Sequence, residues 1–327
     1  MEERTDRTIS LDIFRILCCF GVLSYHSMSG ALSAKLGMAL YYGAAYCIPG
    51  FFMLSGFLVA QKKVITVEYA ENKIKTTLQK FFGWCAFWTC FFFFFRGTIY
   101  NPFHEFFSAM QSGGIMPVGW FLFTYCFLIF FSPYLKKWIE KSFLSFAVCV
   151  CILLFLLALR KFDFLTNSIT QSRWLHLYLT YFMLGMALKK ISAFKFLGTK
   201  KYIVALSAIF FLLSGLYYAH KVILTGRARM PHQYYGSWYY TIWLVSLFML
   251  VFHIKLSSEH ILTKPIKLIS RNTFSIYMAH LPILRLISEK MPVSGMKRTT
   301  LAWGGVIILC IILSELFRRL PLLRKIV

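Results

Sequence analysis

Long apolar runs separated by short polar and basic stretches dominate the sequence. A bilayer core of about 30 Å needs roughly 20 apolar residues in a helix, and a helix satisfies its own backbone polar groups in lipid. The pattern therefore predicts an all-α fold, a polytopic bundle of ten transmembrane helices that forms one transmembrane domain over 1–327 without an appended soluble domain. The predicted spans are about 9–30, 39–60, 78–95, 118–135, 142–159, 173–188, 202–219, 236–254, 272–289 and 299–317.

The basic residues cluster between alternate apolar runs. If the chain begins in the cytoplasm, most of its 36 Lys and Arg fall in the cytoplasmic segments, as the positive-inside rule expects. Both termini are then cytoplasmic. The net charge of +24 follows from this topology, so the expected partner is a lipid bilayer and not nucleic acid. A basic inner surface also suits an anionic cosubstrate or lipid head groups.

Composition agrees with a multi-pass protein of the cell membrane. Hydrophobic residues make up 58% of the chain and Phe alone occurs 35 times. The nine Cys all lie within apolar runs, and none forms a CxxC pair. We interpret them as small apolar residues, so the sequence predicts no disulfide framework, no metal site and no resident cofactor.

The first predicted helix carries three ionisable residues, Asp12, Arg15 and His26. Each costs about 2.5–3.5 kcal/mol within a span, which makes it a candidate functional residue. Arg15 and His26 are eleven residues apart, or three helical turns, so they share one face about 16 Å apart. Histidine acts as a general base near neutral pH, and arginine suits phosphate or carboxylate. The alternative is that His26 bonds a neighbouring helix and Arg15 extends to the interface; spacing leaves both open.

Further candidates lie in other predicted helices. The second contains Pro49, Gly50 and Gly56, which permit a kink or a close helix approach, and its Ser55 is a candidate polar contact. Trp120 opens the fourth, and Ser275, Tyr277 and His280 lie in the ninth. The stretch 64–80 alternates charged and apolar residues and is expected to form an interfacial helix. The other histidines lack metal-ligand spacing: His104, His176, His220, His232, His253 and His260.

Four ordered motifs resemble those of the acyltransferase family 3 membrane proteins. They are Ser-Leu-Asp-Ile-Phe-Arg at 10–15 followed by His26, Pro-Gly-Phe-Phe-Met-Leu-Ser-Gly-Phe-Leu at 49–58, Gly-Trp-Phe-Leu at 119–122 with Pro-Tyr-Leu at 133–135, and Ser-Ile-Tyr-Met-Ala-His at 275–280. The resemblance implies a bacterial ten-helix enzyme that moves an acyl group, usually acetyl from acetyl-CoA, onto a hydroxyl of a sugar or cell-surface polysaccharide.

The resemblance also implies site residues. Arg15 and His26 are the expected catalytic pair, and the cosubstrate is an acyl-CoA. Relatives often carry an Arg-rich stretch ending in Pro before the third helix, whereas residues 72–80 here contain neither Arg nor Pro. We expect acyl-CoA to be bound by Arg15 together with lysines of this stretch, namely Lys73, Lys75 and Lys80. Acceptor binding or structural support is expected from Asp12, Ser55, Trp120, Tyr277 and His280.

Two other function classes fit a bundle with buried charge. One is a transporter or flippase for a lipid-linked glycan or acyl donor, although neither internal symmetry nor paired broken helices are evident. The other is a non-enzymatic membrane partner in a polysaccharide assembly complex. An oligomer is compatible with the sequence in each case.

Overall fold

The computed structural model is all-helical over the residues that it describes, which are 9–98, 100–110, 113–158, 175–192, 200–225, 231–257, 259–291, 294–321 and 323–327. The longer helices are α1 (Ile9–Ser27), α2 (Lys35–Gly43), α3 (Cys47–Gln61), α4 (Val67–Arg96), α5 (Pro102–Met110), α6 (Gly119–Lys141), α7 (Phe143–Ala158), α9 (Leu175–Ser192), α10 (Lys200–Thr225), α11 (Trp238–Phe252), α12 (Thr263–Lys290) and α13 (Met296–Arg319). Short 3₁₀ turns, including η1 (Met28–Ala31), η2 (Ala44–Tyr46) and η5 (Pro231–Tyr234), join some of them.

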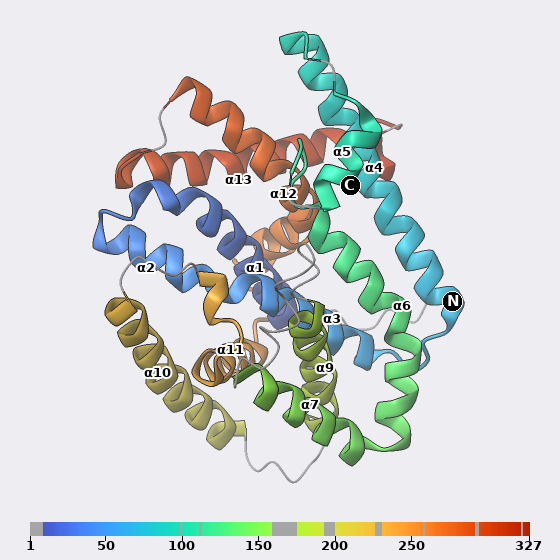
Figure 1. Cartoon of the computed structure of the whole chain (residues 1–327), viewed down its shortest axis with the longest axis vertical. Coiled ribbons are helices and arrows are strands. Elements are labelled where there is room, and N and C mark those ends of the chain that lie inside the picture. The colour runs from blue at the N-terminus through green and yellow to red at the C-terminus, as the bar shows by residue number, and fades with distance from the viewer. Residues whose placement is uncertain are drawn as a thin grey trace.

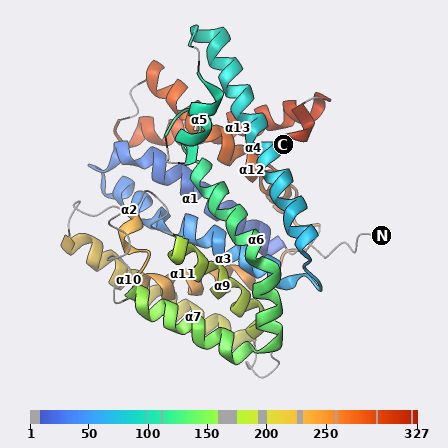
Figure 2. The same ribbon diagram turned by 45° about the vertical axis from the view of Figure 1, so that its right-hand side comes forward.

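Helix α1 lies at the centre of the molecule. It packs against α12, α3, α11 and α13, and in both views it lies between the α12–α13 pair and the α3–α11 side (Figures 1 and 2). Its side chains are buried on several faces, among them Phe14, Cys18, Cys19 and Leu23. An ionisable residue on this helix is therefore held among protein groups and not among lipid tails.

Helices α3 and α9 approach each other through facing glycines. A Cβ atom on Gly56 would collide with the backbone carbonyl of Phe182, and one on Gly185 would collide with that of Met53. Small residues let helix backbones come this close. The close approach expected from Gly56 is therefore present. The predicted second span contains the 3₁₀ turn η2 but remains one continuous span over Lys35–Gln61. Pro49 sits in the first turn of α3, where proline is tolerated.

Two further expectations are refined by the helix boundaries. The stretch 64–80 does not end before the third span: most of it forms the first half of α4, a helix of 30 residues and about 45 Å. The predicted fourth and fifth spans are α6 and α7, which meet at Ser142 with a bend of 119°.

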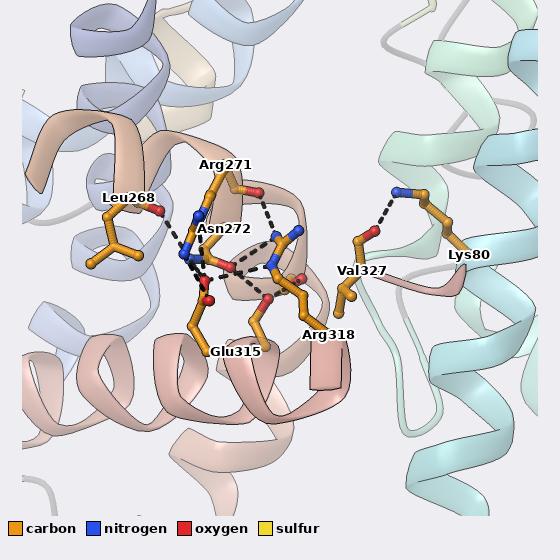
Figure 3. A network of polar contacts seen from close by, with 9 residues as sticks. Lys80, Leu268, Arg271, Asn272, Glu315, Arg318 and Val327 are labelled. Atoms are coloured by element: carbon orange, nitrogen blue, oxygen red, sulfur yellow. Dashed lines mark hydrogen bonds and ion pairs between the residues drawn. The ribbon is translucent and has the colours of Figure 1, made fainter. Parts of the chain in front are cut away.

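A polar network joins the start of α12 to the end of α13 (Figure 3). Arg271 makes two hydrogen bonds to the Glu315 carboxylate, at 3.1 and 2.8 Å. Asn272 donates to the same carboxylate at 2.7 Å, and Arg318 donates to the Asn272 side-chain oxygen at 3.0 Å. These bonds satisfy the charges of two helix ends, which explains how Glu315 is accommodated near the end of an apolar helix.

Every predicted span coincides with a helix, although the ends of two spans, at 159 and 173–174, lie outside the described residues. Among the described helices, five are long and apolar enough to cross a bilayer, or six if the bent α6–α7 pair is one span. Helix α11 has only 15 residues. Helix α12 carries polar groups that bond α1 and α13, which lowers its hydropathy. The ten-span count and the cytoplasmic termini stay predictions.

The glycine contact between α3 and α9 gives a stability test. Gly56→Ala should lower the free energy of unfolding in detergent by about 1–3 kcal/mol, because the new methyl group must displace backbone. Gly43→Ala is the matched control, since a Cβ there meets no atom within 4 Å and its φ is −62°. Thermal unfolding followed by tryptophan fluorescence reports both. Equal melting temperatures for the two variants would contradict the close approach.

Candidate active site

A buried carboxylate fixes the first turns of α1 against α12. Asp12 is 1% exposed, and its Oδ1 accepts hydrogen bonds from Arg15 Nη1 at 2.9 Å and from Ser270 Oγ at 2.7 Å. Arg15 Nη1 also lies 3.2 Å from Ser270 Oγ. The Arg15 side chain remains 26% exposed. The expected pairing of Asp12 with Arg15 is present, and it leaves a partly accessible guanidinium held in one orientation.

Lysines of α4 extend the positive charge around Arg15. Lys73 is exposed and lies within electrostatic range of Arg15 and Lys62. Lys80 Nζ donates to the carbonyl of Val327 at 2.7 Å (Figure 3) and lies over the Phe274 ring. Lys75 projects from the other side of α4, because two helical residues turn through about 200°. Lys73 therefore lies near Arg15, whereas Lys75 lies on the opposite side of α4. The Lys80 side chain is bonded to Val327.

At the other end of α1, His26 borders a cavity of about 480 Å³. Helices α1, α3, α6, α9 and α12 and the turn η5 contribute to its wall. Its lining residues are Val22, Tyr25, His26, Ile48, Pro117, Val118, Trp120, Tyr178, His232, Tyr235, Tyr277 and Leu281. None of these carries a permanent charge, so the lining combines aromatic rings, hydroxyls and imidazoles.

The aromatic wall is held by ring contacts and hydrogen bonds. Trp120 lies 5.6 Å from Tyr178 between ring centroids, and Tyr277 donates its hydroxyl to the Val118 carbonyl at 3.3 Å. The Tyr235 hydroxyl is buried and has no hydrogen-bond partner among the described residues. A buried hydroxyl without a partner costs about 1–3 kcal/mol, which a bound polar ligand would recover.

Tyr25 and His232 form a second polar pair in this wall. The Tyr25 hydroxyl lies 3.2 Å from His232 Nδ1, and the Tyr25 ring stacks on Tyr41 with centroids 5.2 Å apart. Burial lowers the pKa of His232 from its ordinary value, so the ring is neutral at pH 7. His232 therefore adds a hydrogen-bonding group to the cavity without adding charge.

His280 lies behind His26. The two ring centroids are 5.4 Å apart, and His280 is only 1% exposed. Its Nδ1 bonds the backbone carbonyls of Tyr277 at 2.8 Å and Ile276 at 3.2 Å. Of the predicted acceptor residues, Trp120 and Tyr277 line the cavity directly, whereas His280 reaches it through His26.

Ser55 does not join this group. Its hydroxyl donates to the Phe51 carbonyl one turn earlier, at 2.7 Å, and it is not among the cavity-lining residues. Its bond within its own helix is a common arrangement for serine.

Several site residues escaped the sequence prediction. Ser270 completes the Asp12 cluster, and Tyr25, Tyr178, His232 and Tyr235 line the cavity. For His232 and Tyr235, the only sequence signal was a short connection between spans that contains one histidine and two tyrosines, Pro-His-Gln-Tyr-Tyr at 231–235. The spacing of His232 from the other histidines suits no metal, so spacing predicts no role for it.

Comparison with protein families decides the class of the protein. The family model for acyltransferase 3, described as an acyltransferase domain, matches residues 8–319. The chain belongs to the acyltransferase 3 family. Searches of curated proteins and of solved structures returned no significant match. Membership of the acyltransferase 3 family confirms the resemblance of the four motifs over nearly the whole chain. It makes the protein an enzyme of an O-acyltransferase family.

Lys73 and Lys75 lie on different faces of α4, and this difference gives a test of the basic end of the site, the positively charged region around Arg15. In an acyltransferase 3 enzyme supplied with acyl-CoA, Lys73→Gln should raise the KM for acyl-CoA about tenfold. The reason is that it removes a charge-assisted bond to phosphate, which is worth about 1.5–3 kcal/mol. Lys75→Gln, which removes the same charge from the outward face, should stay within about twofold of wild type. Equal KM values for both variants would show that the basic end acts only through its total charge.

Proposed function

We propose that this protein is a membrane O-acyltransferase of the cell membrane that transfers an acyl group, acetyl in the first instance, from acyl-CoA to a hydroxyl of a sugar or cell-surface polysaccharide. The observation that carries this proposal is the position of His26. It borders a cavity on the same helix that carries Arg15 three turns away. Family membership supports acyl transfer. The site geometry suggests the donor and acceptor sides.

The cavity suits a neutral polyhydroxylated acceptor. Aromatic rings such as Trp120 and Tyr178 can pack against the apolar faces of a sugar, while tyrosine hydroxyls and imidazoles bond its hydroxyls. The unpartnered Tyr235 hydroxyl is one such group. Because none of the lining residues is a carboxylate, ammonium or guanidinium, a charged acceptor would lose its hydration there without a counter-charge.

The basic end suits the phosphates of CoA. Arg15 is partly exposed and held by Asp12, and Lys73 adds a second positive charge nearby. Arginine and lysine are the usual phosphate ligands in proteins. From this end the pantetheine arm would carry the thioester about 16 Å along α1 towards His26. Val22, one turn before His26, already lines the cavity.

The proposed reaction needs one base and balances without a cofactor. His26 takes the proton of the acceptor hydroxyl as its oxygen attacks the thioester carbonyl. The tetrahedral intermediate then expels the CoA thiolate, and the protonated His26 returns that proton to the sulfur. The products are the acyl ester and CoA with a free thiol. No metal, oxidant or reductant takes part.

Replacing His26 tests the proposal. His26→Ala should lower label transfer from radiolabelled acetyl-CoA to a glycan acceptor by at least about 10²–10⁴-fold, the usual contribution of a positioned general base. The assay uses purified protein in detergent, with His220→Ala as the matched control because His220 is exposed on α10. Size-exclusion elution should be the same for both variants.

Two outcomes of this assay, and one of a transport measurement in liposomes, separate the possibilities. Loss of transfer in His26→Ala alone supports the proposal. Transfer at the wild-type rate in His26→Ala would remove His26 from the mechanism. If the wild-type protein transfers no label but moves a lipid-linked glycan across liposome membranes, the proposed acyl transfer is wrong for this chain.

A further inference from the structure

The hydrogen bonds of His280 define which of its nitrogens carries the proton. Its Nδ1 lies 2.8 Å from the Tyr277 carbonyl and 3.2 Å from the Ile276 carbonyl. Carbonyl oxygens only accept hydrogen bonds, so Nδ1 is the donor and the lone pair of the neutral ring is on Nε2. This Nε2 atom is buried and has no hydrogen-bond partner among the described residues.

A histidine is an unfavourable choice for packing at this position. A buried polar atom without a partner costs about 1–3 kcal/mol, and an apolar ring of similar size would avoid that cost. The rest of the His280 environment is well ordered, because the side chain is 1% exposed and bonded to the backbone on its other side. The lone pair on Nε2 therefore needs a partner that the working site would provide.

The ring of His26 lies in contact distance of the His280 ring. The centroids are 5.4 Å apart and the rings are inclined by 46°. A ring nitrogen lies about 1.1 Å from its centroid, so two nitrogens turned towards each other would be about 3.2 Å apart, at the limit of a hydrogen bond. Catalytic hydrogen bonds are often loose before substrate binds. A small rotation of the His26 ring would close this one.

The two histidines differ in their access to the cavity. His26 is among its lining residues and His280 is not. His280 is thus in ring contact with a residue of the cavity wall without being part of that wall. This arrangement places His280 behind the base, where it can act on the His26 ring and not on the acceptor.

We propose that His280 is a positioning residue whose Nε2 accepts a hydrogen bond from a ring N–H of His26. That bond fixes the His26 tautomer in which the other nitrogen presents its lone pair to the acceptor hydroxyl. When His26 takes the hydroxyl proton, the same bond stabilises the imidazolium, and His280 itself gains no proton. The inference rests on the proposed function of His26 as general base.

Two substitutions test the roles of the two ring nitrogens of His280 separately. His280→Asn keeps an amide donor close to the Nδ1 position and removes the Nε2 acceptor. His280→Gln places an amide oxygen near the Nε2 position. We expect His280→Asn to lower kcat by about 10- to 100-fold, the range for one hydrogen bond to a charged group, with both KM values unchanged. His280→Gln should recover part of that loss.

The comparison includes wild type and His26→Ala in the same label-transfer assay. The inference is overturned if both His280 variants keep kcat within twofold of wild type while His26→Ala is inactive; the proposed function then survives. It is also overturned if the variants raise only the acceptor KM, which would indicate direct acceptor contact, or if Asn and Gln lose activity equally. Failure of the proposed function is distinct, since wild type would then transfer no label.

A spectroscopic readout does not depend on the folding of a variant. Wild-type protein labelled with nitrogen-15 histidine and bound to a non-hydrolysable acyl-CoA analogue should show magnetisation transfer across an N–H···N bond between the two rings. Its absence from an ordered, analogue-bound sample would contradict the inference.

Discussion

The structure depends on the burial of the Asp12 carboxylate between α1 and α12. A buried charge is tolerated only when it is paired and hydrogen-bonded, and Asp12 meets that condition through Arg15 and Ser270. Removing one partner from such a cluster is far more costly than the pair is stabilising. The cluster therefore fixes how α1 lies against α12. With that position fixed, the other ends of the same helices bring His26 beside His280.

The polar character of α12 follows from this arrangement. One side of the helix meets α1, and its first turns bond α13 through Arg271, Asn272 and Glu315. A lipid-facing helix could not carry these groups cheaply. Helices α3 and α9, joined at Gly56 and Gly185, lie on the other side of the cavity. Function and packing are thus linked, since four of the five helices that line the cavity, α1, α3, α9 and α12, are held by the buried polar and glycine contacts.

Much of this was predictable from the sequence where the signal is local. Apolar runs located the helices, and the spacing of Asp12, Arg15 and His26 indicated one functional stripe. The partners from distant segments were not predictable. Ser270 in α12 has no local pattern, and the local signal for Tyr235 is limited to the histidine and tyrosines at 231–235. The packing of whole helices brings both residues to the site. Ser55, a polar residue in a motif, donates its hydroxyl within its own helix, and its role in the site stays a prediction.

The number of spans also depends on helix neighbours that the sequence does not reveal. Counting spans by hydropathy treats each span as facing lipid, whereas α12 is polar because it packs against protein groups. Helix α11 is shorter than a typical span. The stretch 64–80, expected to be a separate interfacial helix, forms the start of α4. Its charged helical turns run directly into the apolar turns that follow, without a break in the helix. The hydropathy pattern along the chain predicts where a helix lies in the sequence but not which helices pack against it.

In the proposed mechanism, α1 joins a basic donor end at Arg15 to a neutral acceptor cavity at His26. The most direct measurement uses sealed proteoliposomes sorted by orientation, with labelled acetyl-CoA and a neutral glycan each supplied on one side only. We expect transfer when acetyl-CoA is on the side of Arg15 and Lys73 and the glycan is on the side of His26. Transfer only when both substrates share one side would contradict it.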